Sequence, residues 1–290
     1  MRTPTRIGAF AAALGVAFGA AALAGASLDP LRDADDGHGG EAHGGAHSTA
    51  AMETEAGARQ GPPGLAVADG DLRLVAGTTT LARGATTEWA FRIMGPSDAV
   101  TDFQVEHERE MHLIVVRMDL TGYQHLHPRR AADGTWSVPL RLPDAGVYRA
   151  YADFSSGGRS YTLATDLFVV GAFSPRPLPA PVAADETEGY RVELSAEGLV
   201  PGARAGLDYD LSLEGRRLNG VEPYLGADGH LVALREGDLA FLHVHPEESD
   251  VPGRIRFAAE LPSAGRYRLF LQFKHNGAVR TVAHTLEVSS

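Results

Sequence analysis

The chain of 290 residues contains no cysteine. Disulfide scaffolds, thiolate zinc sites, catalytic thiols and blue-copper centres are therefore excluded, because each requires a cysteine sulfur. Beyond the N-terminus, no hydrophobic run is long enough to span a bilayer. Because the lack of cysteine leaves the redox compartment open, localisation must be inferred from the N-terminus.

Basic residues are also scarce, with 26 Lys and Arg against 37 Asp and Glu and a net charge of -11. Nucleic acid is not an expected partner, since no basic stripe is present to neutralise phosphates. An acidic chain with 12 histidines suits small cations better. The length is sufficient for about two domains, each with its own core.

The N-terminus has the pattern of an export signal. Arg2 and Arg6 precede an unbroken run of apolar and small residues, and an A-x-A cleavage site ends at Ala26. We therefore predict a signal peptide over residues 1–26. The same run, if uncleaved, could anchor the protein in a membrane. Either alternative places the mature protein outside the cytoplasmic membrane, extracellular or on the outer face of that membrane.

Residues 27–63 contain almost no large apolar side chains. Such a segment buries too little surface to offset its ordering entropy, so we predict a disordered linker. The linker carries His38, His43 and His47 among acidic residues. His-rich tracts of this kind bind metal ions weakly, and a solubilising linker with incidental histidines is an equal alternative.

From residue 64 onward, short alternating runs such as "TTEWAFRI", "TWSVPLRL" and "SYTLATDLFVV" recur at intervals of about ten residues, which is typical of β-sandwiches. The predicted fold class is all-β, with immunoglobulin-like sandwiches at 64–171 and 190–290. A Pro-rich linker is expected over 172–189. Trp89 and Trp136 are expected in or near the core.

The two sandwich regions are copies of one repeat. "LPDAGVYRAYADF" at 142–154 matches "LPSAGRYRLFLQF" at 261–273, with an offset of 119 residues here and 118 at the histidines. Within the repeat, Tyr148 and Tyr267 follow a Gly-containing turn, as in the tyrosine corner of immunoglobulin-like domains. A duplicated domain and a structural role for these two tyrosines follow.

Each copy carries three histidines at the same relative positions. "HLIVVRMDLTGYQHLHP" spans 112–128 and "HLVALREGDLAFLHVHP" spans 230–246. The imidazoles of a His-x-His strand lie on one face and can converge on one ion. A hairpin turn at Gly237 and Asp238 adds the third histidine opposite them. The predicted metal ligands are His112, His125 and His127 in the first copy and His230, His243 and His245 in the second.

The register of the first hairpin is less well determined. Gly122 could shift its turn away from Asp119 and Leu120, and a slip of one residue would move His112 to the other face. In both copies the proline after the motif, Pro128 or Pro246, is expected to end the strand. "HLIVV" is apolar on both faces, so burial of the imidazoles in ordinary structural hydrogen bonds is the competing interpretation.

Imidazole ligation without thiolate suits copper or zinc, and the site is expected to release its ion as the pH falls through about 6.5. His107, in "VEHEREMH", is a weaker candidate ligand, and a charged edge strand is the alternative. His275 is expected in a turn, and His284 in a structural role.

The paired hairpins and the following "AGxY" strands resemble a family of secreted proteins of high-GC, actinobacterial-type bacteria. Their tandem domains carry HxHP motifs and are similar to the immunoglobulin-like modules of bacterial copper-resistance proteins. The resemblance covers residues 65–290 and implies an exported metal-handling role for the two histidine triplets. This chain lacks the N-terminal histidine and the methionine-rich loop of the copper-resistance pattern.

Three functions remain open at this point. The first is a non-catalytic copper- or zinc-binding protein of the cell envelope, for metal buffering, delivery or resistance. The second is an enzyme, because three histidines with an open fourth position also hold catalytic zinc. The third is a structural or adhesive tandem sandwich. The expected partners are metal ions and, through an uncleaved N-terminus, a membrane. The sequence leaves protein partners open.

Overall fold

The computed structural model describes residues 62–242 and 244–290. These residues form twenty β-strands and no α-helix, which confirms the predicted all-β class. None of them forms a helix of the length and apolar character needed to cross a membrane. The predicted signal or anchor segment 1–26 and nearly all of the linker 27–63 lie outside the described residues, as do His38, His43, His47 and His243.

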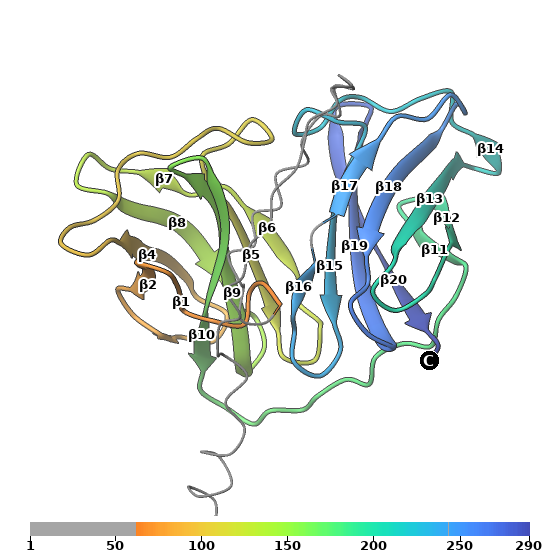
Figure 1. Ribbon diagram of the computed structural model, residues 1–290. Helices are drawn as coiled ribbons and strands as arrows, with labels where there is room; N and C mark the ends of the chain where they lie inside the picture. Colours follow the sequence, from red (N-terminus) through yellow and green to blue (C-terminus); the bar gives the residue numbers. More distant parts are fainter. Residues whose placement is uncertain (1–61, 243) are drawn as a thin grey trace, which may run out of the picture. The chain divides into compact units, whose positions relative to one another are not determined.

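The first sandwich is built from ten strands. They are β1 (Ala68–Asp69), β2 (Leu72–Ala76), β3 (Thr80–Leu81), β4 (Thr86–Met94), β5 (His112–Arg117), β6 (Gln124–Leu126), β7 (Arg129–Arg130), β8 (Thr135–Arg141), β9 (Gly146–Ser156) and β10 (Arg159–Val169). One sheet has the order β1-β2-β4-β8-β7 and the other the order β3-β10-β9-β5-β6 (Figure 1).

The second sandwich repeats this plan. Its strands are β11 (Ala184–Thr187), β12 (Tyr190–Glu197), β13 (Arg204–Leu213), β14 (Arg216–Arg217), β15 (His230–Arg235), β16 (Phe241–Leu242), β17 (Val244–Glu247), β18 (Arg254–Glu260), β19 (Gly265–His275) and β20 (Ala278–Val288). The sheet orders are β11-β12-β13-β18-β17, with β14 beside β13, and β16-β15-β19-β20. Strand β11 lies at the end of the segment 172–189 that was predicted as linker.

Each sandwich buries its own apolar core between its two sheets. Trp89 and Trp136 are 0% and 2% exposed, in agreement with the predicted core positions. The period-two alternation of β19 sends one face inward, where its residues pack with those of β12, β13 and β18. The inward residues of β19 are Tyr267, Leu269, Leu271 and Phe273.

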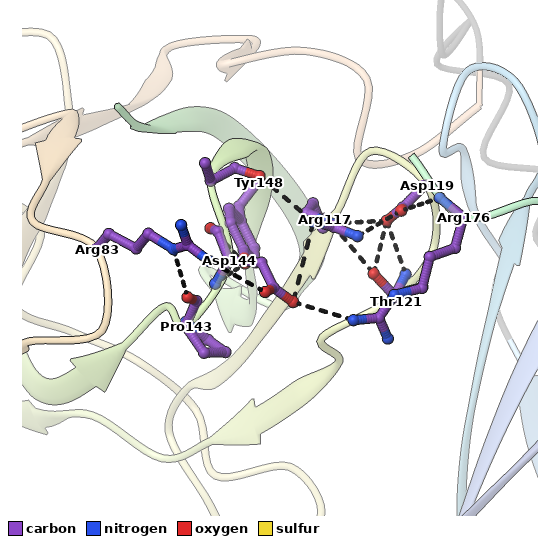
Figure 2. Close-up of polar contacts among 9 residues, drawn as sticks. Arg83, Arg117, Asp119, Thr121, Pro143, Asp144, Tyr148 and Arg176 are labelled. Atoms are coloured by element: carbon purple, nitrogen blue, oxygen red, sulfur yellow. Dashed lines mark hydrogen bonds and ion pairs between the residues drawn. The ribbon is translucent and has the colours of Figure 1, made fainter. Parts of the chain in front are cut away.

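Both predicted tyrosine corners are present. The hydroxyl of Tyr148 donates to the carbonyl oxygen of Asp144 at 3.0 Å (Figure 2). The hydroxyl of Tyr267 donates to the carbonyl oxygen of Ser263 at 2.7 Å. Each bond fixes the turn that leads into the long central strand of its sandwich, so these tyrosines have the structural role expected of them.

The histidine-bearing hairpins have the register that the turn analysis predicts. In the first copy Leu113 faces Leu126 and Ile114 faces His125, and in the second copy Ala233 faces Leu242. Gly122 does not cause a slip. Its φ of 65° is a left-handed value that glycine adopts without strain. The first hairpin therefore keeps the predicted register, and its histidines keep their predicted positions.

A buried ion pair holds the first hairpin turn. Nη2 of Arg117 lies 2.6 Å from Oδ2 of Asp119, and the two side chains are only 4% and 5% exposed. The backbone amide of Arg176, in the segment after the first sandwich, also donates to Asp119 at 2.8 Å (Figure 2). The second hairpin repeats the pair as Arg235 and Asp238. Both turns are therefore tied to the strand that precedes them.

At the HxHP motif the chain leaves one sheet and enters the other. Strand β6 pairs with β5, whereas β7 pairs with β8 across the sandwich. Similarly, β16 pairs with β15 and β17 pairs with β18. The expectation that Pro246 ends its strand is wrong, since β17 continues to Glu247. As an edge strand, β17 accommodates a proline without losing a ladder hydrogen bond.

A third apolar cluster joins the two sandwiches, whose described residues belong to one compact unit. The outward residues of β5 and β15 lie in it, which explains why "HLIVV" is apolar on both faces. The hydroxyl of Tyr151 donates across the contact to the carbonyl oxygen of Leu239 at 2.7 Å. We call this set the interface cluster: Ile114, Val116, Leu120, Tyr151, Ala164, Val232, Leu234, Leu239, Phe241 and Phe270.

Candidate metal site

Three histidines of the first copy come together at the end of the interface cluster. His112 begins β5, His125 lies in β6, and His127 directly follows β6. One ring nitrogen from each lies within 4.8 Å of the others. The ring centroids are 5.2 Å apart for His112 and His125, 5.2 Å for His112 and His127, and 4.8 Å for His125 and His127. The predicted triplet is thus a spatial group.

The hydrogen bonds of His112 determine which of its nitrogens carries the proton. Its Nε2 lies 3.1 Å from the backbone carbonyl oxygen of Glu106. A carbonyl oxygen only accepts hydrogen bonds, so Nε2 must be the donor. In a neutral imidazole the other nitrogen, Nδ1, then holds a free lone pair.

The same reasoning applies to His125 with the opposite nitrogen. Its Nδ1 lies 2.7 Å from the amide oxygen of Gln272, a residue of β19 in the second sandwich. The amide nitrogen of Gln272 donates to Thr281 at 3.2 Å, so its oxygen is the atom presented to the histidine. The ring of His125 is therefore protonated on Nδ1, and its Nε2 is bare.

The two bare nitrogens face each other. His112 Nδ1 and His125 Nε2 are 3.0 Å apart, and no proton remains between them when both rings are neutral. Nε2 of His127 is buried and has no hydrogen-bond partner among the described residues. Two lone pairs thus oppose each other beside the unpartnered Nε2 of His127, and a proton or a metal ion between them would relieve their repulsion.

A proton is disfavoured there at neutral pH. Burial lowers the pKa of His112 to about 4 and that of His125 to about 3. Repulsion from His112 and His127 also lowers the pKa of His125, while its hydrogen bond to Gln272 raises it. Burial likewise lowers the pKa of His127 to about 4. The three imidazoles are therefore neutral, the form that binds metal ions.

The donor set defines the chemistry available. Tetrahedral coordination at about 2.0–2.1 Å places ligand nitrogens about 3.3 Å from one another, close to the separation of the two facing nitrogens. Neutral imidazoles without thiolate or carboxylate suit Zn(II) and Cu(II). Small inward adjustments of three side chains, two of them held on paired strands, would create a coordination sphere.

The histidines of the second copy do not repeat this arrangement among the described residues. His230 lies against the first triplet, with its ring centroid 4.6 Å from that of His125. His245 lies in β17, opposite Ala258 of β18 rather than opposite His230 as we expected. Its side chain is exposed, while the neighbouring Val244 packs against the core. His243 lies outside the described residues, so the second triplet as a whole stays a prediction.

The remaining histidines divide into one near the site and two with structural partners. His107 lies in a tight turn with a left-handed φ of 47°, and its ring centroid is 6.1 Å from that of His112. His275 ends β19 and bonds the hydroxyl of Tyr190 through Nδ1 at 2.8 Å. His284 is buried and bonds the carbonyl oxygen of Val192 at 3.2 Å.

Two partners of the site were missed at the level of the sequence. The carbonyl oxygen of Glu106 is a backbone group and left no signal. Gln272, in contrast, left a signal in the sequence. It is a polar residue in the run "RLFLQF", and it aligns with Asp153, which is also polar and sits beside His112 on β9. A polar residue at this position in both copies marks the face that carries the histidines.

A family model described as a domain of unknown function, DUF8832, matches residues 66–171 and again residues 185–290. The chain belongs to this family. The two DUF8832 matches agree with the duplication predicted from the repeated motifs. No curated protein matches the chain.

Several solved structures match the DUF8832 pair at low sequence identity. A DUF4426 family protein from Pseudomonas aeruginosa is 9% identical, covering 36% of this chain and 94% of its own, with a TM-score of 0.28. A chimeric titin Z1Z2 tandem is 15% identical, covering 76% and 100%, with a TM-score of 0.20. A marsupial T cell receptor is 14% identical, covering 76% and 96%, with a TM-score of 0.22.

Proposed function

We propose that the protein is a non-catalytic metal-binding protein that holds copper or zinc through His112, His125 and His127. One observation carries this proposal. His112 Nδ1 and His125 Nε2 face each other at 3.0 Å with both of their protons directed elsewhere. A structural histidine normally pairs a donor with an acceptor, so two opposed lone pairs favour a cation between them.

Copper and zinc are the ions that this donor set suits, and the affinity order favours Cu(II) where both are present. A protein that binds copper or zinc in this way is suited to metal buffering, delivery or resistance. Of the alternatives, an incidental role for the histidines leaves the buried Nε2 of His127 without a partner in the part of the chain that the structure describes. The unpaired buried group would cost about 1–3 kcal/mol with nothing gained.

The proposed location is the cell envelope or the exterior, and it rests on the sequence of residues 1–26. Its test is N-terminal sequencing of the protein from fractionated producing cells. Export with cleavage would yield a chain that begins after Ala26, and anchoring would leave residues 1–26 in the membrane fraction. Intact chain in the cytoplasm would contradict export.

Metal titration tests the binding proposal. The full chain is used with His38, His43 and His47 changed to Asn, so that the N-terminal tract does not contribute. After removal of bound metal, this protein is titrated with Cu(II) and with Zn(II) by calorimetry, and bound metal is counted by elemental analysis. We expect a tightly bound ion that is lost when His112 and His125 are both changed to Ala.

The matched control is His275→Ala, which removes a histidine that bonds Tyr190 and does not belong to the triplet. It should leave the stoichiometry and affinity unchanged. Circular dichroism establishes that each variant keeps its β-structure. Tight binding that survives the double substitution would refute the three-histidine site.

A further inference from the structure

We infer that His230, supplied by the second sandwich, is a fourth ligand of the same ion. The metal would then bridge the two sandwiches. This inference rests on the proposed function and extends it, because it assigns the site to both repeats. Binding of the metal would then also strengthen the contact between the two repeats.

The position of His230 is the first support. Its ring centroid lies 4.6 Å from that of His125 and 5.6 Å from that of His112. Four imidazoles bound tetrahedrally to one ion through nitrogens at about 2.0–2.1 Å have centroids about 5 Å apart. The ring of His230 therefore lies at spacings from His112 and His125 that are close to those of a shared coordination sphere.

The strand that carries His230 supplies the second support. Along β15, Leu231 and Ala233 face the core of the second sandwich, whereas Val232 and Leu234 belong to the interface cluster. His230 shares the face of Val232 and Leu234 because alternate residues of a strand point to the same side. The packing of the interface cluster thus fixes the direction in which this ring points.

The surroundings of His230 give the third support. Its ring contacts are with other histidines, His107, His112 and His125. Among the described residues neither of its ring nitrogens has a hydrogen-bond partner, and no carboxylate pairs with it. A half-buried imidazole placed against three others, without a counter-ion, is well suited to share a cation with them.

A fourth protein ligand changes the kind of site. Four-coordinate sites filled by protein side chains hold structural or stored metal, whereas catalytic zinc keeps a position open for water. Ligation by His230 thus argues for retention of the ion over water activation. Because an ion that binds the folded state stabilises it, loading would also stabilise the joined arrangement of the sandwiches.

The test compares His230→Ala with His245→Ala in the full chain lacking the three N-terminal histidines. Both residues belong to the second triplet, but His245 is exposed in the other sheet. Loss of an outer hydrogen-bond partner costs about 10–100-fold in metal affinity, and loss of a ligand should cost at least as much. We expect that loss for His230→Ala and no change for His245→Ala.

Two further measurements make the result independent of affinity alone. X-ray absorption of the Zn(II)-loaded protein should count four imidazoles in the parent and three in His230→Ala. Hydrogen exchange should slow on loading in both β5 and β15 of the parent, but only in β5 of the variant. If His230→Ala does not fold, His230→Gln preserves the size and polarity of the side chain and serves in its place.

The outcomes separate this inference from the proposed function. If His125→Ala loses the ion while His230→Ala binds it with parental affinity and ligand count, the bridging ligand is refuted and the three-histidine site stands. If neither substitution changes binding, both proposals fail.

Discussion

Tyr123 of the first sandwich stacks on Phe270 of the second, with ring centroids 4.1 Å apart and planes only 7° from parallel. By sequence alignment of the repeats, the counterpart of Tyr123 is Phe241 and that of Phe270 is Tyr151. These counterparts also meet, at 5.5 Å. The two repeats therefore contact each other through equivalent surfaces, because the same aligned positions in both repeats supply the contacting residues.

The first prediction concerns this stack. Phe270→Ala removes a buried ring from the interface cluster, which should cost about 3–5 kcal/mol of unfolding free energy. Phe168→Ala is the control, since Phe168 is 47% exposed and its loss should have a small effect. Urea denaturation of the metal-free protein measures both. Equal costs for the two variants would show that the stack does not join the sandwiches.

The second prediction concerns Gly64, which has a φ of 72° and lies between two interface rings. A Cβ here would come within 2.7 Å of Tyr151 and 2.8 Å of Phe241. Gly64→Ala should therefore destabilise the protein by about 1–3 kcal/mol through overpacking, in addition to backbone strain. Gly157→Ala is matched, because Gly157 has a φ of 61° and open space at its Cβ. Similar melting temperatures for the two variants would contradict a packing role.

The third prediction concerns acid stability. Burial would raise the pKa of Asp119, but hydrogen bonds from Arg117, Thr121 and the Arg176 amide lower it to about 2. Because the pKa in the folded state lies below its value of about 3.9 in the unfolded chain, the carboxylate stabilises the protein above pH 4. That contribution, about 2–3 kcal/mol for a group this deeply buried, is lost as the pH falls from about 4 to 2.

Asp119→Asn tests this effect in urea titrations of the metal-free protein at several pH values. The variant should be less stable at pH 7, because Arg117 loses its buried partner, and its stability should fall less between pH 4 and 2. Asp133→Asn is the control, since its ion pair with Arg92 is exposed. An unchanged slope for Asp119→Asn would show that this carboxylate does not contribute to acid unfolding.

The fourth prediction concerns Gln272, whose amide oxygen keeps the proton of His125 on Nδ1. Gln272→Leu removes that acceptor and should weaken Cu(II) or Zn(II) binding about 10–100-fold without changing the number of ions bound. Gln272→Glu retains an oxygen acceptor and should bind close to the parental level. Equal affinities for the Leu and Glu variants would contradict control of the tautomer by this residue.

Local patterns predicted the fold and part of the site. Alternation gave the strands, the Gly-containing turns gave the tyrosine corners, and the turn at Gly237 and Asp238 gave the hairpin register. The first triplet followed from the turn at Asp119 and Leu120 in the other copy, because residues on one strand face are fixed by period two. These features depend on neighbours in sequence, which a single chain displays.

What the sequence did not reveal depends on contacts between the repeats. Strand β17 pairs with β18, so His245 does not face His230, and no local pattern indicates that change of sheet. The approach of His230 and Gln272 to His125 depends on which faces the two sandwiches bring together. The apolar outer face of "HLIVV" was the visible sign of that contact, but it did not identify the surface that covers it.

The Pro-rich segment between the sandwiches connects two surfaces that match each other. On separate chains, such a pairing would weaken with dilution, because association between molecules depends on their concentration. A short tether replaces that dependence with an effective concentration of about millimolar. A site assembled from both repeats would then exist in every single molecule. The rate of ion binding would be first order in protein concentration, even in very dilute protein solutions.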